Sequence, residues 1–350
     1  MSKSAGTSNP EYVTARVRSR RAGLFEEDDY RKLVRMSPAE IARFMEESSA
    51  YEEEINALGS RFSGVDLIEY SLNASLAEDF EDILSWCEGK LYGHVARYLR
   101  KFDVWNVKTV LRGVYADTER EAVADDLIRA GEFDERLLER LLDAGSIEEV
   151  VEVLERTVFG DPLADALDDY ESSGVLVPLE NAVDRAYYDL LRTDDLTGEA
   201  LSEYREFLEA EIDFRNAINT LRLARSGTDI NPSEYFIEGG VLFSAAELSQ
   251  LASNTDELVE RIRESRYGER LSDAVAELED AESLIGFEHA LEAALLEYAD
   301  SLGLVHPLSV TPVVSYVLAK EREVDNIRAI ARGKEAGLGP EEIEQELVII

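Results

Sequence analysis

The chain has 350 residues, among them 75 acidic and 36 basic ones, which gives a formal net charge of −39. A surface with this charge repels nucleic-acid phosphates and anionic lipid head groups, so generic binding to either is not expected. Apolar residues make up 45% of the chain, which is enough for a core and excludes extended disorder.

The composition also indicates the setting of the protein. Acids dominate and only seven bases are lysines, a pattern typical of adaptation to a salt-rich cytoplasm, where screening reduces self-repulsion. It predicts loss of structure in low salt. The single cysteine, Cys87, excludes a disulfide framework and fits the cytosol. No charged-then-apolar leader opens the sequence, and Pro307 and Pro312 interrupt its most apolar late run, so we expect a soluble protein.

Residues 1–10 form a polar tail, and helical patterns with short Gly, Pro or Asn breaks follow. Three landmarks then return at intervals of about 110 residues, which indicates an internal repeat. They are a Gly-and-Phe turn, a capping box that begins a helix, and a glutamate near the start of a longer amphipathic helix. The landmarks are Gly23–Phe25, Gly131–Phe133 and Gly240–Phe243; Ser37 with Glu40, Ser146 with Glu149 and Asn254 with Glu257; and Glu69, Glu180 and Glu288.

Each repeat also contains a helix with an acid, an asparagine and an arginine at fixed positions, which we call a signature helix. The three triads are Asp103, Asn106 and Arg112; Asp213, Asn216 and Arg222; and Glu323, Asn326 and Arg332. On each helix the apolar positions form one stripe that faces the core, and the asparagine and the arginine lie on its two flanks. Asparagine is a poor helix-interior residue, so its threefold return needs a physical reason.

Two reasons fit the sequence. The structural one is a polar contact between repeats, or hydrogen bonding at a helix end where the arginine complements the helix dipole. The functional one is that three equivalent polar faces line a central surface that binds a partner. The few bases gather on the signature helices and in residues 1–35, which indicates either ion pairing within a helical bundle or a less acidic central surface.

The beginning of the sequence resembles its end. Residues 12–18, followed by Ala22-Gly23-Leu24, mirror residues 326–332, followed by Ala336-Gly337-Leu338. We therefore expect the two ends to lie close together in an all-α fold of three homologous repeats, closed into a ring or funnel, since an open solenoid needs capping repeats. The expected boundaries are 1–10 for the tail, 11–120 and 121–230 for the first two repeats, and 231–350 for the third with its closing segment.

Motifs for catalysis are missing from the sequence. The three histidines lie far apart, no Glu-x-x-His pair occurs, and one cysteine cannot form a thiolate zinc site. A P-loop, a dinucleotide-binding Gly-x-Gly-x-x-Gly and a Gly-x-Ser-x-Gly elbow are also missing. We expect no catalytic residue, cofactor or metal and no direct nucleotide binding, which argues against a helical enzyme.

Three segments carry a resemblance to a known family: residues 12–18, residues 30–33 (Tyr-Arg-Lys-Leu), and residues 323–328 with Gly333-Lys334 and Gly337-Leu338. In them the chain resembles the C subunit of archaeal-type (A/V-type) ATP synthases, the relative of the d subunit of vacuolar proton pumps. The similarity covers nearly the whole chain, and the acidic, lysine-poor composition is similar to that of haloarchaeal members.

The resemblance implies a funnel of three helical domains with pseudo-threefold symmetry and no catalysis of its own. Such a protein lies in single copy on the membrane proteolipid ring, at the cytoplasmic face, as a peripheral membrane protein. It holds the rotor shaft, made of the D and F subunits, and couples proton or sodium transport to ATP synthesis or hydrolysis. Shaft contacts then fall on the signature triads: Asp103, Asn106, Arg112, Asp213, Asn216, Arg222, Glu323, Asn326 and Arg332. The alternative from a different class is a helical-repeat scaffold that binds protein partners.

Overall fold

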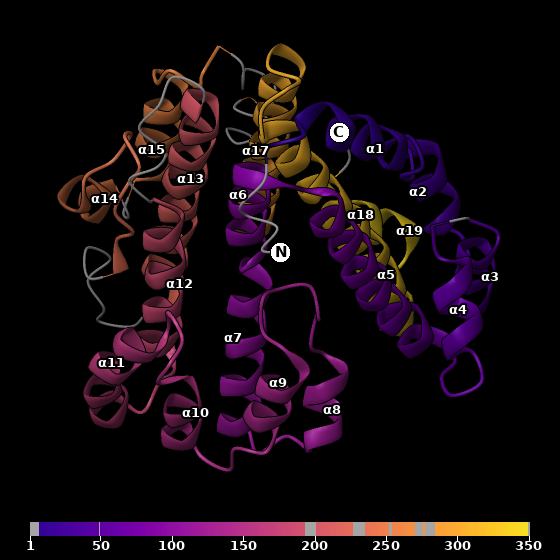
Figure 1. Cartoon of the computed structure of the whole chain (residues 1–350), viewed down its shortest axis with the longest axis horizontal. Coiled ribbons are helices and arrows are strands. Elements are labelled where there is room, and N and C mark those ends of the chain that lie inside the picture. Colours follow the sequence, from indigo (N-terminus) through magenta and orange to yellow (C-terminus); the bar gives the residue numbers. More distant parts are fainter. Residues whose placement is uncertain are drawn as a thin grey trace. The chain divides into compact units, whose positions relative to one another are not determined.

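The computed structural model describes residues 7–48, 50–192, 201–226, 235–251, 254–269, 276 and 284–348. Every regular element in these ranges is a helix, which confirms the all-α prediction (Figure 1). None of the described helices is both long and apolar enough to cross a membrane. The chain divides into two compact units, of which unit 1 comprises Met1–Asn9 and Tyr70–Thr193, and unit 2 comprises Pro10–Glu69 and Asp194–Ile350.

Unit 1 is built around its signature helix, α7. Its helices are α5 (Gly64–Trp86, from Tyr70 onward), α6 (Gly89–Leu99), α7 (Lys101–Tyr115), α8 (Arg120–Asp125), α9 (Glu135–Leu142), α10 (Ile147–Leu154), α11 (Gly160–Ser173) and α12 (Val177–Leu191). Helix α7 packs against α6, α8, α9, α10 and α12. The predicted apolar stripe of Val104, Val107 and Leu111 is buried, and so are Phe102 and Val110 on other sides of the helix. This signature helix is therefore central, covered on several faces.

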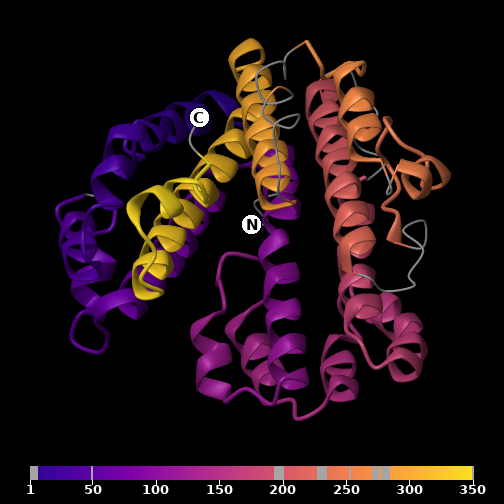
Figure 2. The same ribbon diagram turned by 180° about the vertical axis from the view of Figure 1, so that it is seen from behind.

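Unit 2 contains the other two signature helices, α13 and α18. Its helices are α1 (Pro10–Arg21), α2 (Glu27–Leu33), α3 (Pro38–Glu46), α4 (Glu52–Leu58), α13 (Ser202–Ser226), α14 (Ala245–Leu251), α15 (Thr255–Arg263), α17 (Leu284–Val305), α18 (Thr311–Glu335) and α19 (Pro340–Glu344), together with the first turns of α5. Helix α18 packs against α17, α1, α2, α3, α13 and α19, and α17 packs against both signature helices (Figure 2). Segments from residues 10–46 and from residues 311–344 thus share one core.

Helix starts follow the predicted capping residues. Ser37, Ser146 and Asn254 are the N-caps of α3, α10 and α15. Ser37 and Glu40 form the complete capping box, whereas the Glu149 carboxylate accepts from the Gly145 N–H at 2.7 Å. The predicted helix starts are confirmed, with this variation in the return contact. The prediction that the two ends of the sequence lie together concerns residues 1–6 and 349–350, which lie outside the described residues.

Candidate functional site

The asparagine of each signature helix is buried and holds the backbone of a segment that follows the helix. The pairs are Asn106 with Ile128, Asn216 with Ile237, and Asn326 with Val348. In each pair the side-chain Nδ2 donates to the backbone carbonyl and Oδ1 accepts from the N–H of the same residue, at 2.8–3.0 Å. The neutral amide carries a donor and an acceptor side by side, which explains why asparagine returns at this position.

The acid of α7 holds a second point of the same loop. Asp103 accepts from the backbone N–H groups of Glu132 at 2.9 Å and Phe133 at 3.1 Å. A Cβ atom on Gly131 would lie 2.0 Å from Oδ1 of Asp103, so only glycine fits beside the carboxylate. Burial raises the pKa of Asp103 to about 6, although the two backbone donors act in the opposite direction. We call the contacts of the acid and the asparagine of one signature helix a clasp.

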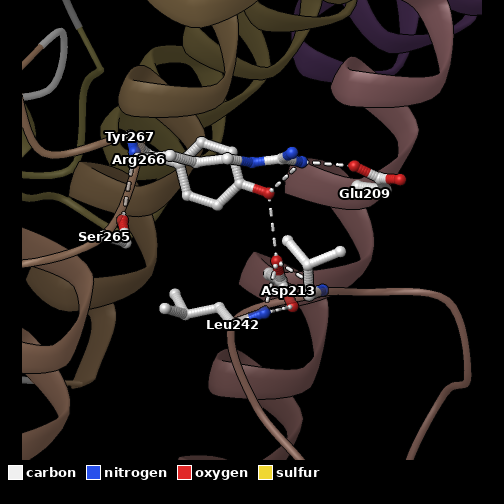
Figure 3. A network of polar contacts seen from close by, with 7 residues as sticks. Glu209, Asp213, Leu242, Ser265, Arg266 and Tyr267 are labelled. Atoms are coloured by element: carbon white, nitrogen blue, oxygen red, sulfur yellow. Dashed lines mark hydrogen bonds and ion pairs between the residues drawn. The ribbon is translucent and has the colours of Figure 1, made fainter. Parts of the chain in front are cut away.

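The clasp of α13 adds a tyrosine to this plan (Figure 3). Asp213 accepts from the backbone N–H groups of Val241 and Leu242 at 3.1 and 3.0 Å. The Tyr267 hydroxyl donates to Asp213 at 3.1 Å, and the Arg266 guanidinium donates to that hydroxyl at 3.0 Å. Burial is the main cause that raises the pKa of Asp213, and the hydrogen bonds counteract it.

The clasp of α18 contains a buried ion pair. Glu323 accepts from the backbone N–H of Phe25 at 2.5 Å, from the Tyr51 hydroxyl at 2.5 Å and from Nζ of Lys320 at 3.0 Å. Nζ of Lys320 also donates to the Tyr51 hydroxyl at 2.8 Å, and all three side chains are buried. Burial lowers the pKa of Lys320, and the negative charge of Glu323 opposes that shift. Phe25 lies 298 residues before Glu323, so this clasp joins segments that are far apart in the sequence.

The arginines of the triads behave differently, because they remain exposed. Nε of Arg112 donates to Glu180 at 2.6 Å, and Nε of Arg332 donates to Glu69 at 2.7 Å, while the two arginine side chains stay 58% and 51% exposed. Both acceptors are the landmark glutamates of the longer helices α12 and α5. Arg222 lies in α13, but its side chain is outside the described residues. The described arginines of the triads thus take part in ion pairs.

The structure brings the acid and the asparagine of each triad together in one clasp, and it joins Arg112 and Arg332 to a glutamate of another helix. The acids and asparagines satisfy buried backbone groups, as the structural interpretation of the asparagines expects. Contact of the triads with a shaft stays a prediction, and Arg112 and Arg332 are the described members with exposed side chains. Sequence reasoning missed Lys320 and the two tyrosines, although Tyr51, Phe159 and Tyr267 recur at a spacing of 108.

The clasps provide hydrogen bonds between a helix and a loop. Within the described ranges, no group of three or more His, Cys, Asp or Glu side chains is arranged to hold a metal ion. The fold and these contacts define an all-α protein in which the repeated acid and asparagine of the signature helices hold loops in place.

Comparison with known proteins identifies the family. A model of the ATP synthase (C/AC39) subunit family matches residues 13–346. The chain is 70% identical over 345 residues to the A-type ATP synthase C subunit of Haloferax volcanii, with 99% of each chain covered. It is 56% identical over 350 residues to the protein of the same name from Halobacterium salinarum, and 34% identical over 356 residues to that of Methanosarcina mazei, with 99% of this chain covered in both cases. The chain belongs to the ATP synthase (C/AC39) subunit family, which confirms the resemblance and fits the halophilic composition.

Proposed function

We propose that this chain is a non-catalytic central-stalk component of an A-type ATP synthase. It couples the rotor shaft to the membrane proteolipid ring and so links proton or sodium transport to ATP synthesis or hydrolysis. The observation that carries the proposal is the match over nearly the full length of both chains to relatives named as the C subunit of A-type ATP synthase. The protein acts in single copy at the cytoplasmic face of the membrane, as a peripheral protein without a cofactor. Its partners are shaft proteins of the D and F type and the ring.

The proposed architecture is a closed funnel of three repeats, 11–120, 121–230 and 231–350, with pseudo-threefold symmetry. Three equivalent clasps support it, because the same acid and asparagine positions hold equivalent loops. The third clasp supports closure, since Glu323 near the end of the sequence holds Phe25 near its beginning. The third repeat therefore needs the segment around Phe25 as well as the segment around Glu323 to form its clasp.

The shaft contact is proposed for the arginines of the triads: Arg112, Arg332 and, from its sequence position, Arg222. The acids and asparagines then act indirectly, by fixing the helices that carry these arginines. Several weak contacts around one cavity provide a multivalent grip on an asymmetric shaft. Contacts of exposed guanidinium groups fix the orientation of the shaft more than they add to its affinity. High salt weakens these electrostatic contacts, so apolar packing contributes more of the binding free energy in a salt-adapted protein.

The first test is recovery of partners. The tagged chain is purified from native membranes in high salt, and the proteins that accompany it are identified by mass spectrometry. Shaft proteins and proteolipid at about one copy of this chain per complex would support the coupling role. Unrelated soluble proteins without any ATPase component would overturn it and favour the scaffold alternative.

The second test separates the arginines from the fold. The triple variant Arg112→Glu, Arg222→Glu and Arg332→Glu should keep its helix content by circular dichroism but lose ATP-driven ion transport in membrane vesicles. Arg31→Glu is the control, because Arg31 is 54% exposed like the triad arginines, whereas its ion pair with Glu27 stays within one helix. Normal transport by the triple variant would make these arginines structural residues.

A further inference from the structure

The turn between α17 and α18 exposes an unusual group of aliphatic side chains. Leu304, Val305 and Leu308 are 76%, 62% and 56% exposed, which makes them the three most exposed large apolar side chains in the described part of the chain. They fall between residues 304 and 308, whereas the other exposed apolar side chains are scattered. Three exposed aliphatic side chains within five residues of an acidic chain indicate an interaction surface, although His306 between them pairs with Glu203 of α13 at 3.2 Å. We call these three residues the apolar tip.

Local hydrogen bonds hold the backbone of the apolar tip in a defined turn. The N–H of His306 donates to the carbonyl of Leu302 at 2.9 Å, which closes the last turn of α17. Ser309 Oγ then accepts from the N–H of Thr311 at 3.2 Å and opens α18. The equivalent turn between α5 and α6 lies 220 residues earlier and keeps a leucine, Leu84, at the position of Leu304. It carries Ser85 and Glu88 at the positions of Val305 and Leu308, so two of the three apolar side chains are particular to the third repeat.

A basic helix lies directly beside the apolar tip. Thr14 Oγ1 of α1 donates to the carbonyl of Pro307 at 2.9 Å, and α1 packs along α18 (Figure 2). Helix α1 has four arginines and one acid in 12 residues, on a chain with a net charge of −39. Its outer face exposes Arg16, Arg18 and Tyr12, the last at 50%. The Tyr12 hydroxyl accepts from Arg16 at 2.7 Å, so the ring and the guanidinium form one unit.

Aliphatic side chains on an exposed turn, together with an exposed tyrosine and exposed arginines on the helix that contacts this turn, form a combination that suits the interface of an anionic bilayer. Aliphatic groups enter the acyl region, tyrosine lies at the head-group level, and arginine is attracted to the net negative charge of an anionic head group. We propose that the apolar tip, with Tyr12, Arg16 and Arg18 of α1, inserts into the surface of an anionic lipid membrane. A lipid surface accepts a protruding turn without a preformed groove, which a protein partner would have to supply.

The acidity of the whole chain does not oppose this local contact in high salt. At about 1 M salt the Debye length is about 3 Å, so repulsion between the remaining surface and the lipid is screened. Apolar insertion is not screened by salt, so it supplies most of the binding, and the arginines, whose attraction salt weakens, add the preference for anionic lipid. The proposal stands on this surface alone and does not depend on the coupling role, because neither the shaft nor the proteolipid ring is a lipid.

The test uses the purified full chain in high KCl and vesicles of phosphatidylglycerol or phosphatidylcholine. A polarity-sensitive dye is placed at Leu304→Cys, and the native Cys87 is buried and does not compete for the label. The dye emission should shift to the blue with phosphatidylglycerol vesicles. The matched control is Val241→Cys, whose native side chain is 55% exposed in the same unit, and its dye should not shift.

Binding is measured in parallel by vesicle flotation. The double variant Leu304→Ser and Leu308→Ser should reduce the bound fraction at least about tenfold, and Val241→Ser should not. Arg16→Gln with Arg18→Gln should remove the preference for phosphatidylglycerol. Each of three results would overturn the proposal: no bound fraction, equal binding to both lipids, or binding of the tip to detergent-solubilised proteolipid ring without any binding to vesicles.

Discussion

The clasps of α7 and α18 use the same helix positions with different chemistry. In unit 1 the short Asp103 accepts from two backbone N–H groups and its burial raises its pKa to about 6. In unit 2 the longer Glu323 accepts from one backbone N–H, and Lys320 and the Tyr51 hydroxyl complete its surroundings. The buried acid of α7 thus depends on backbone donors, whereas that of α18 also has an ammonium group beside it.

The difference follows the length of chain that each clasp closes. Asp103 holds residues 29 and 30 positions away, whereas Glu323 holds a residue 298 positions away. Closing a loop about ten times longer costs about 2 kcal/mol more conformational entropy. Glu323 has two contacts that Asp103 lacks, from Lys320 and from the Tyr51 hydroxyl, and we infer that these contacts offset part of that cost. Of the clasps of α7 and α18, the one that joins the more distant segments is the one with the additional buried ion pair.

The largest effect should come from removing the ammonium of α18. Lys320→Met leaves Glu323 buried without its counter-ion, which should lower the free energy of unfolding by about 3–5 kcal/mol. The measurement is a denaturant titration in high KCl, followed by circular dichroism.

Arg100→Met is the matched variant in unit 1, because residue 100 precedes Asp103 as residue 320 precedes Glu323. Arg100 pairs with Glu132 near the surface, with side chains 24% and 35% exposed. An ion pair of this kind contributes about 1 kcal/mol or less. Equal losses in the two variants would contradict the view that α18 carries the reinforced clasp.

Replacing the asparagine should destabilise the α7 and α18 clasps to the same extent. Asn106→Ala and Asn326→Ala each leave one buried N–H and one buried carbonyl without the partner that the amide supplies. Each change should cost about 2–3 kcal/mol, and the two costs should be similar, because the bond geometry is the same. Thermal unfolding measures both, with Asn56→Ala as a near-neutral control on the surface. A large difference between the stability losses of Asn106→Ala and Asn326→Ala would mean that the asparagine also contributes to the greater strength of the α18 clasp.

Glycine-to-alanine substitutions should also destabilise the α7 and α18 clasps to different extents, although the difference in unfolding free energy should be smaller. A Cβ on Gly131 would lie 2.0 Å from the Asp103 carboxylate, whereas one on Gly23 would find its nearest neighbour, the Arg20 carbonyl, at 3.4 Å. Gly131→Ala should therefore cost about 2 kcal/mol through displacement of the carboxylate, and Gly23→Ala less than about 0.5 kcal/mol. The shift of the unfolding midpoint is the measurement. Gly240→Ala should behave like Gly131→Ala, since its Cβ would lie 2.0 Å from Asp213.

The sequence predicted the helices and the capping residues, because these depend on local periodicity and on residues three or four positions apart. It also singled out Asn106, Asn216 and Asn326, whose poor helix propensity demanded a tertiary reason. It did not predict their partners, because a backbone N–H and carbonyl have no sequence signature. The Lys320–Glu323 pair was hidden for another reason: a lysine three residues before a glutamate on a helix usually forms an exposed pair, and only tertiary packing buries this one.

The pH dependence of α7 is the smallest effect that the comparison predicts. Burial raises the pKa of Asp103 to about 6, above its value in an unfolded chain, and nearby Arg100 and Glu132 act on it in opposite directions. The folded state therefore binds this proton more tightly than the unfolded state, so Asp103 contributes stability at low pH that is lost as the pH rises through about 6. Between about pH 5 and about pH 7 the loss should be about 1 kcal/mol. Unfolding titrations of the wild type and of Asp103→Asn across this range isolate the contribution, because the variant cannot titrate at this position. Parallel curves for the two proteins would mean that Asp103 stays ionised in the fold and that the two backbone donors outweigh its burial.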